Sequence, residues 1–136
     1  MRFLARREHS RSELQRKLSF LAAEGEDVEA LLDDLTARGW LSDARFAEQS
    51  IRSKSRRFGP VKLAHQLRSK GVEADTVSAA FRAAGIEGAA SIERVWRSRF
   101  SAPAVNDRER ARQVRFLQGR GFALDGILRF LKEASR

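Results

Sequence analysis

Arginines spaced along one face of a helix are the residues of this sequence best suited to do chemistry. Arg45, Arg52 and Arg56 fall, together with Glu48, within one narrow stripe at about 100° per residue. The apolar residues Ala47, Ile51 and Phe58 lie on the opposite side. A guanidinium group carries a planar fork of N–H donors that fits a carboxylate or a phosphate in bidentate fashion. The stripe therefore predicts an outward basic ridge that binds an acidic partner.

A second basic ridge is predicted nearer the C-terminus. Arg108, Arg112 and Arg115 share a helix face, and Arg94 and Arg97 point away from the apolar stripe of their own helix. Arginine predominates over lysine; a genome rich in G and C produces the same bias, but it does not align arginines on helix faces. The candidate binding residues for a carboxylate- or phosphate-bearing partner are Arg45, Arg52, Arg56, Arg57, Arg68, Lys70, Arg94, Arg97, Arg108, Arg112, Arg115 and Arg120.

Side chains that could catalyse a reaction are not grouped in any familiar way. Cysteine is absent, which removes disulfides, thiol catalysis and cysteine metal sites. His9 and His65 stand at no metal-ligand spacing with another histidine or a pair of carboxylates. The glycines are single residues at predicted helix ends rather than a phosphate-binding cluster, and no serine has a nucleophile-elbow context. We expect a binding protein, not an enzyme, without metal or cofactor.

The net charge of +9 is unevenly placed along the chain. Residues 1–41 hold seven Lys/Arg and eight Asp/Glu (−1), residues 42–86 hold nine and four (+5), and residues 87–136 hold eleven and six (+5). Clustered positive charge steers acidic partners such as phosphates towards a protein. A charged surface that only maintains solubility is the alternative reading.

The predicted compartment is the cytoplasm. No apolar run approaches the roughly 18 residues that cross a bilayer. Met1 leads directly into Arg2, Arg6 and Arg7, without the apolar region of a signal peptide. The lack of cysteine agrees with a reducing environment, and we expect no contact with a membrane.

Capping residues and terminal glycines divide the sequence into predicted helices. These run over residues 10–25, 27–39, 42–59, 60–71, a stretch ending at residue 85, residues 92–100, 106–121 and 124–131. No window alternates polar and apolar residues long enough for a strand. Trp40, Trp96 and most phenylalanines lie on apolar stripes and are predicted to pack in the core.

Three glycines indicate an internal repeat. Gly25 and Gly71 are 46 residues apart, and Gly71 and Gly121 are 50 residues apart, a period typical of helical arrays. Coincidence is the alternative, because glycine commonly ends helices. The sixth residue after each glycine is apolar, being Leu31, Val77 or Ile127.

The sequence thus predicts an all-α fold, an elongated tandem array of three three-helix repeats. The predicted repeats are residues 1–41, near neutral with a short first helix, and residues 42–86 and 87–136, both basic. We expect the protein to be a monomer.

Several motifs resemble those of the RecX family, regulators of bacterial recombination. They are residues 4–10 (LARREHS), 39–47 (GWLSDARFA), 57–60 (RFGP), 70–72 (KGV) and 116–122 (FLQGRGF). The motifs occur in the family's order over nearly the whole chain. The family's tandem three-helix repeats agree with the fold predicted from the glycine period.

The resemblance implies a regulatory protein of DNA repair and the SOS response. It would bind the RecA filament on DNA and inhibit the recombinase, ATPase and co-protease activities of RecA, and its charge suggests contacts with single- or double-stranded DNA as well. The alternatives are a non-specific DNA-binding helical module, a helix-turn-helix module and a structural adaptor. Basic ridges spread over two repeats disfavour a single recognition helix, and no platform of aromatic and basic residues is evident.

Overall fold

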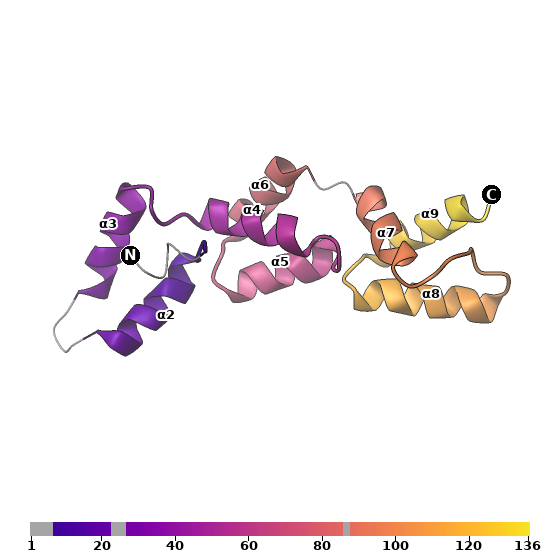
Figure 1. Ribbon diagram of the computed structural model, residues 1–136, viewed down its shortest axis with the longest axis horizontal. Helices are drawn as coiled ribbons and strands as arrows, with labels where there is room; N and C mark the ends of the chain where they lie inside the picture. The colour runs from indigo at the N-terminus through magenta and orange to yellow at the C-terminus, as the bar shows by residue number, and fades with distance from the viewer. Residues whose placement is uncertain (1–6, 23–26, 86–87) are drawn as a thin grey trace. The chain divides into compact units, whose positions relative to one another are not determined.

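The computed structural model describes residues 7–22, 27–85 and 88–136, with the side chains of residues 88–90 excepted. Within these ranges the chain is helical and contains no strand, which confirms the predicted all-α class (Figure 1). The helices are α2 (Arg11–Leu21), α3 (Val28–Ala37), α4 (Asp43–Lys54), α5 (Pro60–Ser69), α6 (Ala74–Ala84), α7 (Gly88–Arg97), α8 (Asp107–Gly119) and α9 (Leu124–Ala134). None of these helices is long and apolar enough to cross a membrane.

The chain divides into two compact units. Unit 1 comprises residues 1–51 and 66–84, and unit 2 comprises residues 52–65 and 85–136. Two of the dividing points lie inside helices, after Ile51 in α4 and before Gln66 in α5. The predicted repeats 1–41, 42–86 and 87–136 follow the chain instead, and the three-repeat division stays a prediction.

Four polar side chains begin helices as the sequence predicts. Each accepts a hydrogen bond from the backbone N–H three residues further on, which satisfies a donor that the first turn of a helix leaves free. Such a cap contributes about 1 kcal/mol. The capping residues are Ser10, Asp27, Ser42 and Asn106, with distances of 3.1, 3.0, 3.2 and 2.9 Å.

Unit 1 has a leucine core between α2 and α3. Leu14 from α2 packs with Leu32 and Leu35 from α3 and with Leu41. Truncating a buried leucine to alanine costs about 2–5 kcal/mol. Further along unit 1 the buried apolar residues are Phe46, Ala47, Ile51, Leu67, Val72, Val77 and Ala80.

The helical register of α3 differs from the predicted glycine pattern. Leu31, predicted as the counterpart of Val77 and Ile127, is 38% exposed, whereas the neighbouring Leu32 is fully buried. Leu32 belongs to the core together with Leu35, almost one turn further on. The spacing from the glycine predicts an apolar residue at this offset, but it does not decide which of two adjacent leucines is buried.

Unit 2 has a core built from α7, α8 and α9. Trp96 Nε1 donates to Gln113 Oε1 at 3.0 Å, and Gln113 Nε2 donates to the Ala102 carbonyl at 3.3 Å. This buried polar bridge ties the connection between α7 and α8 to α8 itself. Trp96 is buried, as predicted. The buried core residues are Ile92, Val95, Trp96, Leu117, Phe122, Ile127 and Leu131.

Trp40 does not join a core, contrary to the prediction. Its side chain is 51% exposed. Gly39, with φ +77°, ends α3 in the left-handed region and turns the chain away from it. The Arg38 guanidinium lies 5.9 Å from the centre of the Trp40 ring. Trp40 therefore belongs to the surface of unit 1.

Helix α4 ends at Lys54, not at Gly59 as predicted. The Lys54 carbonyl closes the helix by accepting the N–H groups of the third and fourth residues after it, both at 3.0 Å. Because Pro60 disfavours the α region at the residue before it, the helix has to end ahead of α5. Arg56 consequently lies in the turn, and the ridge predicted along this helix does not reach it.

Gly71 and Gly121 follow α5 and α8 in the left-handed backbone region, with φ of +87° and +101°. Each also touches another helix so closely that a side chain has no room. A Cβ on Gly71 would lie 2.1 Å from Ser12 Oγ, and a Cβ on Gly121 would lie 2.3 Å from Lys62 Cβ. Both constraints admit only glycine. Gly25, the third glycine of the predicted repeat, lies outside the described residues.

We expect Gly121→Ala to lower the free energy of unfolding by more than about 2 kcal/mol, because left-handed backbone strain adds to the clash with Lys62. Gly119→Ala is the matched control, since nothing lies within 4 Å of its added Cβ and it occupies the last turn of α8. Alanine there should raise stability by up to about 1 kcal/mol. Urea unfolding followed by circular dichroism measures both. Equal effects of the two substitutions would contradict this account of Gly121.

Candidate functional site

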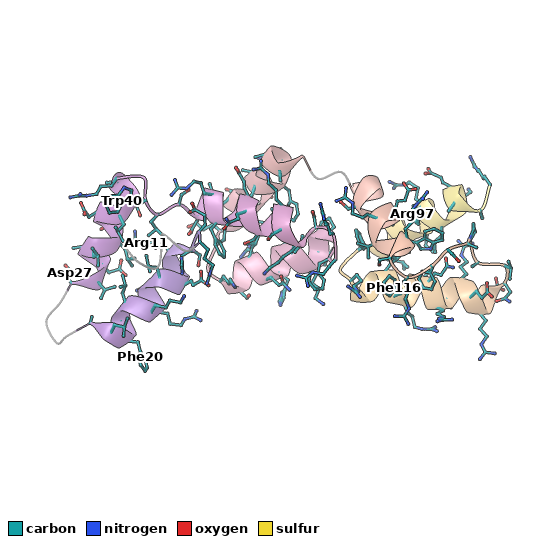
Figure 2. All side chains as sticks on the ribbon, in the orientation of Figure 1. Arg11, Phe20, Asp27, Trp40, Arg97 and Phe116 are labelled. Carbon is teal, nitrogen blue, oxygen red and sulfur yellow. The ribbon has the colours of Figure 1, made fainter. Side chains whose placement is uncertain are left out.

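The twelve predicted binding residues lie at the surface, ten of them exposed and Lys70 and Arg120 half-buried. Three belong to unit 1, namely Arg45, Arg68 and Lys70, and the other nine belong to unit 2. Figure 2 shows nitrogen-tipped side chains projecting from α8 around the labelled Phe116. The predicted basic residues are thus concentrated on unit 2.

Three of the twelve cations meet a carboxylate. Arg45 pairs with Glu8 at 3.1 Å, Lys70 approaches Glu13 at 3.6 Å, and Arg97 pairs with its helix neighbour Glu93 at 2.7 Å. The other nine form no ion pair with any residue in the described ranges, and of these only Arg68 lies in unit 1. Unit 2 therefore holds a set of guanidinium groups whose charge is available to an external anion.

Part of this charge is organised around the ring of Phe58. The Lys62 Nζ lies 4.7 Å from the ring centre, and the guanidinium carbons of Arg57 and Arg120 lie 5.7 and 6.0 Å from it. The negative face of an aromatic ring attracts cations, by about 0.5–1 kcal/mol at exposed sites. Three positive side chains thereby gather at one half-buried ring.

The same pattern continues onto two further rings. Arg120 and Arg99 lie 5.1 and 5.7 Å from the centre of Phe116, and Arg112 lies 6.0 Å from the centre of Phe100. Phe100 and Phe116 meet edge to face at 5.3 Å. We call this set the basic–aromatic cluster; its members are Arg57, Phe58, Lys62, Arg99, Phe100, Arg112, Phe116 and Arg120.

Backbone hydrogen bonds hold the two halves of the cluster together. Gly59 N–H donates to the Arg120 carbonyl at 2.7 Å, and Val61 N–H donates to the Gly121 carbonyl at 2.9 Å. Arg120 Nη1 also donates to the Arg57 carbonyl, at 3.3 Å. Residues about sixty positions apart in the sequence are fixed side by side within unit 2. A guanidinium that lies over a ring can still bind a carboxylate or phosphate through its in-plane N–H groups; on Arg120 one of them, Nη1, already donates to Arg57.

Sequence reasoning found only part of this cluster. It named Arg57, Arg112 and Arg120, but it missed Lys62 and Arg99, and its statement that no aromatic and basic platform is evident was wrong. The available signal was the pairing of a basic residue, a phenylalanine and a glycine in the RFGP and RGF motifs. The two motifs meet only in the folded chain, and the spacing of residues in the sequence does not reveal that contact.

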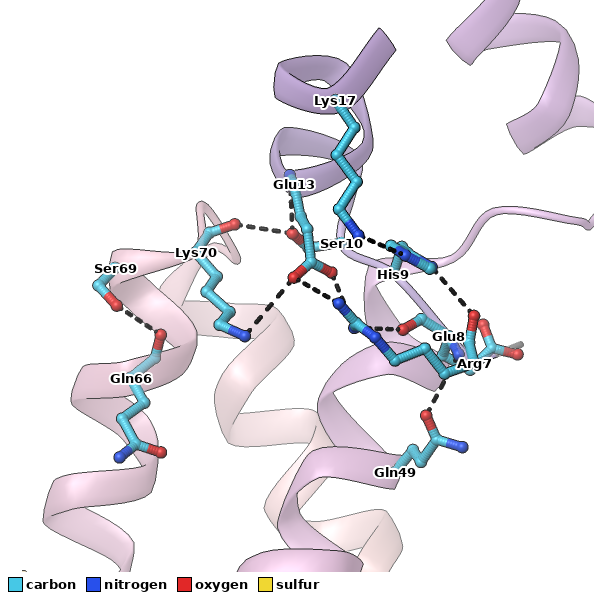
Figure 3. Close-up of polar contacts among 10 residues, drawn as sticks. All are labelled: Arg7, Glu8, His9, Ser10, Glu13, Lys17, Gln49, Gln66, Ser69 and Lys70. Atoms are coloured by element: carbon cyan, nitrogen blue, oxygen red, sulfur yellow. Dashed lines mark hydrogen bonds and ion pairs between the residues drawn. The ribbon is translucent and has the colours of Figure 1, made fainter. Parts of the chain in front are cut away.

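Unit 1 uses its cations differently, in a polar network at the start of α2 (Figure 3). The Glu13 carboxylate accepts both Arg7 Nη1 and Nη2, at 3.1 and 3.0 Å, and also faces Lys70. Ser10 Oγ, which caps α2, donates to the Lys70 carbonyl at 2.9 Å. The Glu13 side chain therefore forms ion pairs with Arg7 and Lys70, and Ser10 alone caps α2 through its hydroxyl.

A second arm of the network engages α4. Glu8 Oε1 accepts Arg45 Nε at 3.1 Å, and the Glu8 N–H donates to Gln49 Oε1 at 3.3 Å. Arg45 and Lys70, both predicted to bind a partner, are thus occupied inside unit 1. Their contacts hold the segment before α2 against α4 and the end of α5.

Two groups of the network have shifted pKa values. Burial is the largest influence on Glu13 and by itself raises its pKa, but the hydrogen bonds and charge of Arg7, together with Lys70, bring the pKa below its ordinary value. Burial is the largest influence on His9 and brings its pKa below the ordinary value; the hydrogen bond with the Arg7 carbonyl opposes this shift, and the charges of Arg7 and Lys17 add to it. Both shifts favour the state in which Glu13 is charged and His9 is neutral.

The neutral form of His9 agrees with its contacts. Its Nδ1 lies 3.0 Å from the Arg7 carbonyl, which can only accept, and its Nε2 lies 3.2 Å from Lys17 Nζ, which can only donate while charged. The ring therefore carries its proton on Nδ1. Protonating Nε2 would place a second donor against the lysine ammonium.

We expect the native protein to lose stability as the pH falls from 7 towards 5. A lowered pKa of His9 in the folded chain means that the unfolded chain binds more protons below the ordinary pKa of 6.5. The contribution of Glu13 is lost only below its ordinary 4.5, outside this range. Urea unfolding across this pH range should show a weaker dependence for His9→Gln than for the wild type. His65→Gln, a change at an exposed histidine, is the control, and the same flattening in both variants would refute the assignment.

The chain is similar to named proteins over nearly its whole length. A family model described as RecX, second three-helix domain, matches residues 42–80. The regulatory protein RecX of Leptothrix cholodnii is 42% identical over 134 residues, which cover 98% of this chain and 85% of that protein. The regulatory protein RecX of Pseudomonas fluorescens is 41% identical, over 96% of this chain and 86% of that protein.

The crystal structure of RecX from Lactobacillus salivarius has the same fold, with a TM-score of 0.76 at 19% identity over 98% of this chain and 90% of that one. The chain belongs to the RecX family of regulatory proteins.

Proposed function

We propose that this chain binds the RecA filament on DNA and inhibits the recombinase, ATPase and co-protease activities of RecA. The observation that carries the proposal is the basic–aromatic cluster, in which five cations meet no carboxylate among the described residues. The family resemblance supplies the identity of the filament. A protein filament on DNA presents phosphates and carboxylates together, and both suit this cluster.

The physical role of the cluster in this proposal is to supply an anion-binding surface that is ordered before binding. Arg120 rests on both Phe58 and Phe116, which limits the freedom of its long side chain. Binding then costs less side-chain entropy than it does for a fully mobile arginine. Contacts with phosphates also release counterions, so that affinity should depend steeply on salt.

A non-specific DNA-binding helical module remains the second candidate, because the same unpaired arginines favour it. The two candidates differ in their ligand. A filament regulator has higher affinity for RecA assembled on single-stranded DNA than for the DNA alone, whereas a DNA-binding module does not. The proposal also includes three things that the sequence predicts: a division into three repeats, a monomeric state and a location in the cytoplasm.

The decisive experiment adds the full chain to a RecA ATPase assay on single-stranded DNA. We expect inhibition by the wild type, and we expect the triple variant Arg57→Gln, Arg99→Gln, Arg112→Gln to need about tenfold more protein, because it removes three charge-assisted contacts. The matched control changes Arg82, Arg110 and Arg129 to Gln, which removes the same charge from exposed arginines outside the cluster.

Equal weakening by the two triple variants would show that total charge matters and that the cluster does not. No inhibition by the wild type at any stoichiometry would exclude the RecA proposal. Unchanged helical circular dichroism in all three proteins keeps the comparison free of folding effects.

The salt dependence of binding to single-stranded DNA tests the cluster separately. The slope of log affinity against log salt should be about two units shallower in the cluster variant than in the wild type, since each lost phosphate contact removes about 0.7. Fluorescence anisotropy of a labelled oligonucleotide between low and moderate salt measures it. An unchanged slope would mean that these arginines do not contact phosphates. The cluster would then be expected to bind carboxylates of the protein partner.

A further inference from the structure

The aromatic rings of unit 2 continue past the basic–aromatic cluster. Trp96 lies 6.3 Å from Phe100 and 5.6 Å from Phe130, the latter edge to face. Phe58, Phe100 and Phe116 each have a cation of the chain over the ring, whereas no cation among the described residues lies over Trp96 or Phe130. Trp96 and Phe130, the two rings nearest α9, are therefore free of a covering cation from the described part of the chain.

This end of the row forms the wall of an open groove of about 740 Å³. The half-buried rings of Phe100 and Phe130 supply most of the aromatic surface, Trp96 lies behind them with 7% of its surface exposed, and Glu93, Arg97 and Glu133 also line the groove. Figure 2 marks Arg97 at the end of α7. All the lining residues belong to unit 2, so that the groove does not depend on the placement of unit 1.

The groove carries negative oxygen atoms in a chain whose net charge is +9. Arg97 donates from Nε and Nη2 to the same atom, Glu93 Oε1, at 3.0 and 2.7 Å. Glu93 Oε2 receives no hydrogen bond from the described part of the chain, and Glu133 forms no ion pair there. The groove therefore retains acceptors for an added cation even with Arg97 in place.

The groove is also fixed in shape. Trp96 is held through its indole N–H by the buried Gln113, and Gln113 in turn holds the Ala102 carbonyl of the connection beside the groove. A wall that needs no rearrangement lowers the cost of binding.

We propose that this groove binds an arginine or lysine side chain presented by a partner protein. The aliphatic stem would pack on the aromatic wall, and the charged head would meet the ring faces and the carboxylates of Glu93 and Glu133. Nucleic acid is disfavoured as the occupant, because phosphates are repelled by these carboxylates. A second copy of the chain is disfavoured by the mutual repulsion of two molecules with net charge +9.

The test uses the capped peptide acetyl-Gly-Arg-Gly-amide as a probe on the full chain, followed by NMR of the tryptophan indole N–H groups. Arginine should move the Trp96 signal in a saturable way and leave Trp40 unmoved, because Trp96 lines the groove and Trp40 does not. The same peptide with citrulline, which has the shape of arginine without its charge, should not bind. Glu133→Gln should weaken binding about threefold, as expected for an exposed ion pair. Glu73→Gln is the matched control for Glu133→Gln, because it removes the same charge from an exposed residue of unit 1. It should leave the affinity for the arginine peptide unchanged.

Equal binding of the citrulline peptide would overturn the proposal in favour of a merely apolar groove. Equal binding by Glu133→Gln and the wild type would overturn it as well. A Trp96 shift that grows with protein concentration in the absence of peptide, and is lost in Glu133→Gln, would assign the groove to a second copy. The probe contains neither RecA nor DNA, so that its result is independent of the proposed function.

Discussion

The close approach of Gly121 to Lys62 is the constraint on which the rest of unit 2 depends. Only a hydrogen atom fits where a Cβ on Gly121 would lie 2.3 Å from Lys62 Cβ. At this separation the N–H groups of Gly59 and Val61 donate to the carbonyls of Arg120 and Gly121, at 2.7 and 2.9 Å. The segment after α4 is thereby aligned with the end of α8, and the arginines on both share the rings of Phe58 and Phe116. The missing side chain of one glycine thus allows a cluster of five cations to form.

Among the described residues, ion pairs predominate in unit 1 and contacts between cations and aromatic rings predominate in unit 2. In unit 1 the cations are matched by carboxylates, as Arg7 and Lys70 are by Glu13, which stabilises the local fold and leaves less charge for a ligand. In unit 2 the five cations of the basic–aromatic cluster lie over aromatic rings, whereas Arg97 pairs with Glu93. The basic–aromatic cluster, which we propose to bind anions, therefore lies in unit 2, and the ion-pair network around Glu13 lies in unit 1.

Local features were predictable from the sequence, and tertiary ones were not. The caps at Ser10, Asp27 and Asn106 and the helix end at Gly71 depend on neighbouring residues alone, and the structure has them as predicted. The ridge prediction for Arg56 failed because helical periodicity does not tell where a helix stops. Lys62 and Arg99 were missed because their importance comes from rings that are distant in the sequence. Exposed charge was foreseen, but its arrangement around aromatic side chains required the fold.

The hydroxyl of Ser10 joins two helix ends. It accepts the Glu13 N–H at the start of α2 and donates to the Lys70 carbonyl just after α5. If either helix end frays, a hydrogen bond of the other end is lost. Gly71, just after α5, also packs tightly against Ser12 of α2. We therefore expect the two helix ends to open together, so that amides at the start of α2 and at the end of α5 become exchangeable in the same event.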